Sequence, residues 1–204
     1  MEIKNIVFDV GNVLVRYDPA SIVSQAFPLH NDKASLVQSL FKEKIWYDLN
    51  LGYITEEEAI QSYHRQLGIT LEDLQSLLVT VKSSLIPIPG TIELLKTLHR
   101  ADFNIYALTD NTHGIMAYLK ERYDFWPLLK GIVVSAEIGH LKPSKEIYHH
   151  LLTTYLLKPH ETVFIDDIAR NVEGAIACGI RAIQFSNIEQ CISDLEKMRI
   201  RVER

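Results

Sequence analysis

The sequence predicts an α/β protein: a Rossmann-like parallel sheet with helices on both faces and an inserted helical cap. From residue 86 onward, short apolar runs of strand length alternate with helical segments, a pattern that favours a parallel sheet with right-handed crossovers. The apolar run at residues 5–8 has no nearby strand to pair with, so it is expected to join the same sheet. Between these parts, residues 20–84 show helical spacing and no convincing strand.

The individual helices are indicated by residues that favour the start of a helix and by the spacing of apolar residues. Apolar residues recur at helical intervals within 33–42. Thr55, followed by three glutamates, starts a helix that ends at Gly68, because a hydroxyl caps free N–H groups and acidic side chains favour the first turn. Thr70, also followed by acidic residues, starts the next helix. Beyond residue 86 we expect helices at 91–100, 114–122, 143–156, 172–178 and 187–197, and strands at 103–108, 132–134, 162–165 and 181–185.

The chain is expected to form two units. Its 204 residues accommodate one domain that carries a smaller insertion. The change from purely helical to alternating pattern falls at the proline-rich stretch that begins at Ile86. We therefore expect an α/β core domain formed by residues 1–15 and 86–204, and a helical cap domain formed by residues 16–85.

Composition and charge narrow the classes of partner. The 47% hydrophobic and 23% charged residues are typical of a globular protein. With 21 Lys and Arg against 26 Asp and Glu, the net charge of −5 disfavours a nucleic-acid binder, which is usually basic. No apolar run approaches the ~18 residues of a membrane helix, so no membrane partner is expected. The two cysteines, Cys178 and Cys191, indicate a reduced, cytoplasmic protein. The sequence carries no signal for the oligomeric state.

Charged and polar residues cluster where the expected strands end. They are Asp9 after the first strand, Thr109, Asp110 and Asn111 after the second, and Asp166 and Asp167 after the strand at 162–165. The loop after the strand at 132–134 adds Lys142. Because ligands of open parallel sheets bind at the carboxyl ends of the strands, we expect these residues to share one site.

These residue types fit phosphoryl chemistry with a metal ion. Neighbouring carboxylates repel one another and therefore need a cation. Oxygen ligands without cysteine or clustered histidine suit Mg²⁺, which commonly also binds a substrate phosphate. The Thr109 hydroxyl, the Asn111 N–H and the Lys142 ammonium can hold a phosphoryl group, and we expect Asp110 beside them at the substrate. Asp9 can then act as the nucleophile, as carboxylates do in aspartyl-phosphate chemistry.

Four segments carry a resemblance to a known family. Residues 8–14 (FDVGNVL), 108–111 (LTDN), 141–143 (LKP) and 164–171 (FIDDIARN) match, in order, the four motifs of the haloacid dehalogenase-like (HAD) hydrolase superfamily. Their order and spacing cover nearly the whole chain, which makes the match specific. The resemblance implies a Mg²⁺-dependent hydrolase, and residues 16–85 resemble the helical cap that closes over the substrate in this family.

The resemblance also implies a role for each matched residue. Asp9 is expected to be the nucleophile that becomes an aspartyl-phosphate, and also a metal ligand. Thr109 is expected to bind a phosphoryl oxygen, and Lys142 to steady the nucleophile and the phosphate. Asp167 is the main expected metal ligand, with Asp166 beside it as a weaker candidate. The expected partner is a small phosphorylated substrate.

One position departs from the family's usual pattern. Most HAD phosphatases carry a second aspartate two residues after the nucleophile as general acid and base, and here that position is Gly11. The carbonyl of Gly11 can still bind the metal, but a proton donor typically worth about 10²–10⁴-fold in rate is missing. The Asp-x-Gly-Asn variant resembles a subgroup that includes a bacterial phosphatase acting on glucose 1-phosphate. A sugar phosphate such as glucose 1-phosphate is therefore the expected substrate.

Two other functions stay open. A 2-haloacid dehalogenase of the same superfamily would use Asp9 to displace halide and would need no metal, although the acidic pair at 166–167 argues against it. A weakly active or non-catalytic binding module on the same scaffold is motivated by Gly11.

Individual residues also have simpler explanations. Taken alone, Asp9 is a residue type that commonly occurs in turns, and Asp166 or Asp167 can cap the helix that follows. Trp46 and Tyr47 are candidates for substrate contacts from the cap, although aromatic residues in such a unit more often form its core.

Overall fold

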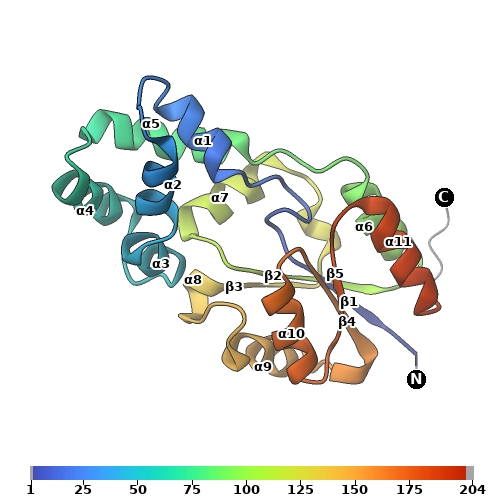
Figure 1. Cartoon of the computed structure of the whole chain (residues 1–204). Helices are drawn as coiled ribbons and strands as arrows, with labels where there is room; N and C mark the ends of the chain where they lie inside the picture. Colours follow the sequence, from blue (N-terminus) through green and yellow to red (C-terminus); the bar gives the residue numbers. More distant parts are fainter. Residues whose placement is uncertain (1, 201–204) are drawn as a thin grey trace.

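The computed structural model describes residues 2–200 and contains a five-stranded parallel sheet flanked by helices (Figure 1). The strands are β1 (Asn5–Phe8), β2 (Asn104–Thr109), β3 (Gly131–Val134), β4 (Thr162–Asp166) and β5 (Arg181–Gln184). They lie in the order β3-β2-β1-β4-β5, and every neighbouring pair is parallel. The predicted α/β fold is therefore confirmed, with the N-terminal strand at the centre of the sheet.

Helices cover both faces of the sheet, because successive residues of a strand point to opposite sides. Ile6 and Phe8 of β1 belong to one buried apolar cluster, and Val7 belongs to another. The first cluster includes residues of α6 (Thr91–Arg100), α7 (His113–Arg122) and α11 (Ile188–Lys197). The second includes residues of α9 (Lys145–Thr154) and α10 (Ala169–Ala177). Burial of apolar side chains on both faces explains why the strands read as continuous apolar runs.

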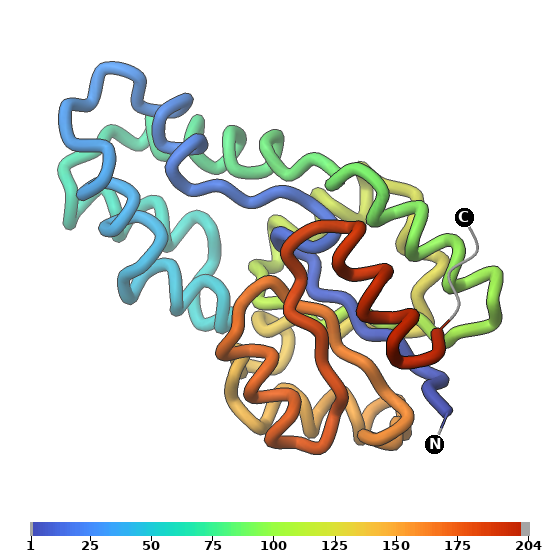
Figure 2. Tube along the Cα trace, turned by 45° about the vertical axis from the view of Figure 1, so that its right-hand side comes forward, coloured from blue at the N-terminus to red at the C-terminus, as the bar shows by residue number. Residues whose placement is uncertain are grey.

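The segment between β1 and α6 is entirely helical and lies to one side of the sheet (Figure 1). Its helices are α1 (Pro19–Ala26), α2 (Lys33–Phe41), α3 (Lys44–Asn50), α4 (Glu56–Leu67) and α5 (Leu71–Ser84). Two linkers join this segment to the sheet, and they run side by side (Figure 2). The Arg16 N–H donates to the Ile86 carbonyl at 2.8 Å, and the Ile88 N–H donates to the Leu14 carbonyl at 2.9 Å. We keep the division at residues 16–85 as a proposal and call this segment the cap.

Helix boundaries follow the capping signals where a side chain supplies the cap. Thr55 and Glu58 form a capping box at the start of α4, and Gly68 ends that helix with φ +69°. Helix α1 is not predicted from the sequence, although the Asp18 side chain caps it. The short helices α3 and α8 (Ser135–Ile138) are not predicted either, and helix α10 begins at Ala169, three residues earlier than predicted. Helices α3, α8 and α10 have no side-chain hydrogen bond at the N-cap, so the sequence carries no start signal for them.

The two cysteines are free, and Cys191 is buried. Cys178 follows α10 and is half-buried. Among residues 2–200, no helix has the length and apolar character needed to cross a membrane. The two short 3₁₀ helices, η1 (Trp126–Leu128) and η2 (Pro159–Glu161), complete the regular structure.

Candidate active site

Strand register brings acidic residues together at one edge of the sheet. Phe8 of β1 is aligned with Ala107 of β2 on one side and with Ile165 of β4 on the other. The residues immediately beyond these positions therefore leave the sheet at the same edge. Asp9 follows β1, and Asp166 is the last residue of β4. The structure therefore brings Asp9 and Asp166 together at this edge of the sheet.

A buried lysine holds two of the carboxylates. The ammonium of Lys142, on the loop after α8, lies 2.8 Å from Asp9 Oδ1 and 2.7 Å from Asp166 Oδ2. It also donates to the Leu108 carbonyl at 3.3 Å. Lys142 is only 4% exposed and Asp9 only 6% exposed. Ion pairs in such a dry environment are strong and fix the positions of both partners.

Asp166 and Asp167 have different surroundings although they are adjacent. Asp166 is fully buried and accepts hydrogen bonds from the Ile168 N–H at 2.8 Å and from the Asn171 amide at 3.0 Å. Asp167 is half-buried and lines the cavity described below. One oxygen each of Asp9, Asp166 and Asp167 lies within 4.8 Å of the others.

The electrostatic state of the site follows from burial. Burial raises the pKa of Asp9 well above its usual value, and the Lys142 ammonium opposes this shift. Burial also raises the pKa of Asp167, and the nearby Asp166 charge raises it further. For Lys142, burial alone would lower the pKa, but the charges of Asp9 and Asp166 outweigh it and hold the pKa above its usual value.

The carboxylate cluster fits a divalent cation. The donors are oxygens alone, which suits Mg²⁺ better than metals that prefer nitrogen or sulfur. One lysine does not balance three neighbouring carboxylates. Burial is the main cause of the raised pKa values of Asp9 and Asp167, and the charge of Asp166 raises both further. A cation placed among the three oxygens would relieve their mutual repulsion.

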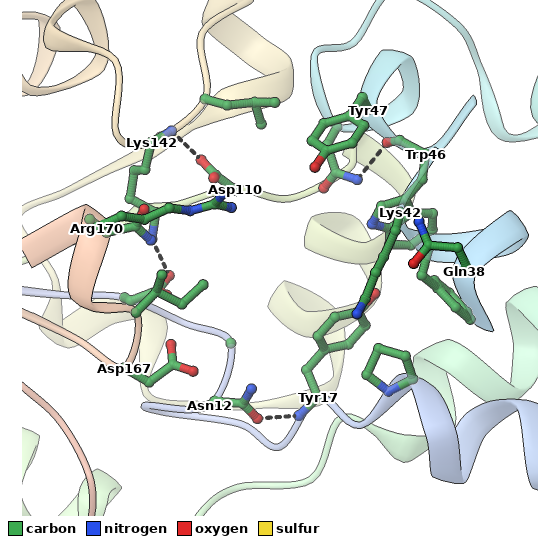
Figure 3. Close-up of a pocket in the computed structure, with 18 residues that line it drawn as sticks. Asn12, Tyr17, Gln38, Lys42, Trp46, Tyr47, Asp110, Lys142, Asp167 and Arg170 are labelled. Atoms are coloured by element: carbon green, nitrogen blue, oxygen red, sulfur yellow. Dashed lines mark hydrogen bonds and ion pairs between the residues drawn. The ribbon is translucent and has the colours of Figure 1, made fainter. Parts of the chain in front are cut away.

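The acidic edge forms the floor of a cavity of about 620 Å³ between the sheet and the cap (Figure 3). Most of the labelled side chains lie in two groups, with Asp110, Lys142, Asp167 and Arg170 on one side and Lys42, Trp46, Tyr47 and Gln38 on the other. The first group comes from the sheet edge and α10, and the second from the cap. A cavity of this size holds a small organic molecule.

Not every residue expected from the sequence reaches the cavity. Asp9, Gly11, Trp46, Asp110, Lys142 and Asp167 line it. Thr109 is the last residue of β2, is buried, and does not line the cavity. Asp166 is buried behind Lys142 and does not line it either. Asn111 lines a smaller neighbouring hollow, and its N–H donates to the Ser135 hydroxyl at 2.9 Å.

Sequence reasoning missed much of the cap side of the cavity. Tyr17, Phe41 and Trp46 form an aromatic wall: the Phe41 and Trp46 rings meet edge to face at 4.9 Å, and the Tyr17 ring is parallel to Trp46 within 4°. The Tyr17 hydroxyl is buried without a hydrogen-bond partner among the described residues. Lys42 and Arg170 also line the cavity. No motif marks Tyr17, Phe41 or Lys42, because these residues approach the site only when the cap folds over the sheet. Arg170 lies within the matched segment 164–171, which could have indicated it.

The carboxyl edge of the parallel sheet brings several carboxylates and a buried lysine together beneath the helical cap. This arrangement defines a class of enzymes whose active site is centred on a carboxylate. The family model of haloacid dehalogenase-like hydrolases matches residues 3–179. The chain belongs to this family, and it is a hydrolase.

Individual relatives agree with this assignment. A sesquiterpene phosphatase of Aspergillus oryzae is 27% identical over 184 residues, covering 90% of each chain. A D-ribitol-5-phosphate phosphatase of Bacteroides thetaiotaomicron is 24% identical over 202 residues, covering 91% of this chain and 93% of that protein. A solved HAD family enzyme of Bacteroides thetaiotaomicron, in complex with magnesium and inorganic phosphate, superposes with a TM-score of 0.76 at 21% identity. It covers 90% of this chain and 94% of the other, and the likeness shows the shared fold.

Proposed function

We propose that the protein is a Mg²⁺-dependent phosphatase that hydrolyses a small phosphomonoester through an aspartyl-phosphate on Asp9. The observation that carries this proposal is the pairing of Asp9 with buried Lys142, 2.8 Å apart, at the floor of a cavity that also exposes Asp167. The ion pair favours the charged form of Asp9 and orients one of its oxygens, which is what a nucleophilic carboxylate needs.

Each residue of the site has a proposed task. Asp9 attacks phosphorus, and Lys142 holds the nucleophile and neutralises charge on the phosphoryl oxygens. The Thr109 hydroxyl, at the end of β2, is proposed to contact the phosphoryl group. The Asn111 N–H donates to the Ser135 hydroxyl in this structure, and it is proposed to exchange that bond for one to a phosphoryl oxygen. Asp110 is proposed to meet the substrate from the same turn, since it lines the cavity.

The proposed metal ligands are Asp9, Asp167 and the Gly11 carbonyl. Asp166 is the weaker candidate, because Lys142 and Asn171 already occupy both of its oxygens. When bound, Mg²⁺ supplies positive charge that stabilises the phosphoryl oxygens and relieves repulsion among the carboxylates.

For the substrate we propose a sugar phosphate, with glucose 1-phosphate as the first compound to test. The aromatic wall of Tyr17, Phe41 and Trp46 offers flat apolar surface, against which the C–H face of a sugar ring can pack. Lys42 and Gln38 offer hydrogen bonds to hydroxyl groups from the cap. The related D-ribitol-5-phosphate phosphatase is named for a sugar-alcohol phosphate, which supports the same class.

The experiment is a phosphatase screen over sugar phosphates, nucleotides and flavin mononucleotide, with Mg²⁺ and with EDTA. We expect turnover that depends on Mg²⁺ and is abolished in Asp9→Asn. Acid quenching with ³²P-labelled substrate should trap label on the wild-type protein and none on the variant. The control is Asp124→Asn, a carboxylate on the exposed surface outside the cavity. Full activity of Asp9→Asn would refute the proposed mechanism.

The dehalogenase alternative is tested in the same series. A dehalogenase needs no metal, and the cluster of three carboxylates argues against it. Release of halide from a 2-haloacid in the presence of EDTA would favour that alternative, and robust phosphate release would exclude a non-catalytic binding module.

A further inference from the structure

The proposed phosphatase mechanism leaves one chemical requirement unmet. When the P–O bond of an alkyl phosphate breaks, the departing oxygen becomes a strongly basic alkoxide unless it receives a proton. The residue two positions after Asp9 is Gly11, which has no side chain to supply one. Another group that lines the cavity must therefore deliver the proton if the enzyme cleaves unactivated substrates.

A second carboxyl group, that of Asp110, borders the open space beside Gly11. Gly11 and Asp110 both line the main cavity, and both also line a hollow of about 70 Å³ beside it. A Cβ added to Gly11 would meet no atom closer than 4.0 Å, so the space next to it is free. Asp110 thus faces the same hollow that an aspartate at position 11 would reach. Figure 3 shows Asp110 on the side of the cavity that carries Lys142.

The Asp110 carboxyl is anchored through only one of its oxygens. Its Oδ1 accepts a hydrogen bond from the Lys142 N–H at 2.9 Å. Among residues 2–200, no donor is hydrogen-bonded to Oδ2 and no cation lies within ion-pair distance of it. The fixed Oδ1 sets the orientation of the group, and Oδ2 is left for a ligand in the cavity.

We propose that Asp110 is the general acid and base of this enzyme, in place of the missing residue at position 11; this inference rests on the proposed function. In the first step, Asp9 forms a bond to phosphorus while the bond to the leaving oxygen breaks, and that oxygen takes the proton from Asp110 Oδ2. In the second step, a water oxygen bonds to phosphorus while the Asp9–phosphorus bond breaks. The water proton passes to Asp110, which restores the starting state.

The electrostatic surroundings shift the pKa of Asp110 in the direction that the first step requires. Burial raises the pKa of Asp110, the Lys142 charge and its backbone hydrogen bond lower it, Asp166 raises it and Arg170 lowers it. Asp9 lies close enough to Asp110 that the negative charges of the two carboxylates repel each other. Burial dominates, so the Asp110 pKa lies above its usual value, closer to the operating pH of an efficient general acid.

The test compares Asp110→Asn with the wild type on two substrates. The asparagine carbonyl still accepts the Lys142 N–H bond, so only the titratable group is removed. With glycerol phosphate, whose alkoxide must be protonated, we expect kcat/KM to fall by about 10²–10⁴-fold. With p-nitrophenyl phosphate, whose leaving group departs as a stable anion, we expect a loss of less than about tenfold. The basic limb of the kcat profile for glycerol phosphate should disappear, and Asp124→Asn should behave as wild type.

Each result distinguishes this inference from the proposed function. Equal losses on both substrates, or no loss on glycerol phosphate, with an active wild type would overturn the role of Asp110 alone. A wild type that releases phosphate from neither substrate in Mg²⁺ would overturn the phosphatase proposal and this inference together. Unfolding curves and residual p-nitrophenyl phosphatase activity show whether the variant is folded.

Discussion

Replacing Lys142 with methionine should destabilise the protein in a manner that depends on pH. The substitution keeps the length and apolar stem of the side chain but leaves Asp9 and Asp166 without their shared cation. Asp166 retains the Ile168 N–H and the Asn171 amide, whereas Asp9 Oδ1 retains only the N–H of Val10 at 2.7 Å. The cost therefore falls mainly on Asp9.

The size of the loss in stability follows from the burial of Asp9. Breaking a buried ion pair by removing one partner costs about 3–5 kcal/mol. For a protein of this size, each kcal/mol shifts Tm by about 2–4 °C, so a fall of about 6–20 °C is expected near neutral pH. The pKa of Asp9, already raised by burial, rises further once Lys142 is gone. A carboxyl whose pKa is higher in the folded state contributes stability only at low pH, and that contribution is lost as the pH rises.

The assay is urea unfolding in EDTA at pH 5 and pH 8. We expect the loss in free energy of unfolding to be larger at pH 8, because Asp9 must then be charged while buried. Lys96→Met is the matched control: Lys96 forms an exposed pair with Glu93, for which a loss of less than about 1 kcal/mol is expected. Equal losses for the two variants, or a Lys142→Met deficit that does not change with pH, would refute the reasoning.

Three further predictions concern the metal, the proton donor and the contact between cap and sheet. Asp167→Asn should raise the Mg²⁺ concentration for half-maximal activity by at least tenfold, measured by Mg²⁺ titration; an unchanged value would remove it from the ligand set. Gly11→Asp, introduced into Asp110→Asn, should restore glycerol phosphate turnover at least tenfold, since both positions line one hollow; no recovery in a folded protein would contradict a shared role. Gly52→Ala should lower stability more than Gly68→Ala in urea unfolding. Both glycines have positive φ, but a Cβ at Gly52 would lie 2.1 Å from a backbone oxygen of α8, whereas a Cβ at Gly68 would meet no atom. Equal losses in stability would show that the backbone around Gly52 shifts to accommodate the Cβ at little cost.

The sheet was predictable because its signals are local. The apolar runs ending in Asp9, Thr109 and Asp166 gave strands to within a residue or two. The start of α4 at Thr55 was predictable because its hydroxyl and a nearby glutamate form the cap within one turn of chain. Helix α3 was missed because Glu43, which precedes it, makes no such bond, and the helix is held by packing within the cap.

The site was only partly predictable because its decisive contacts join distant parts of the chain. Strand order puts Asp9 beside Asp166, but the sequence does not show that Lys142 binds both. It also does not show that Thr109 is buried away from the cavity. The shared hollow of Gly11 and Asp110 depends on a separation of about a hundred residues, which no local pattern records.

The paired linkers have an evolutionary consequence. The chain leaves the sheet and returns to it at one point, where Val15 is bridged to Pro87. The helices between these residues can therefore be lengthened, shortened or replaced without changing the register of any strand. Selection can change the cap residues that line the cavity while the carboxylates at the sheet edge stay in place. New substrate preferences can then arise by exchanging one continuous stretch of gene, which makes this junction the natural point for building chimeric enzymes.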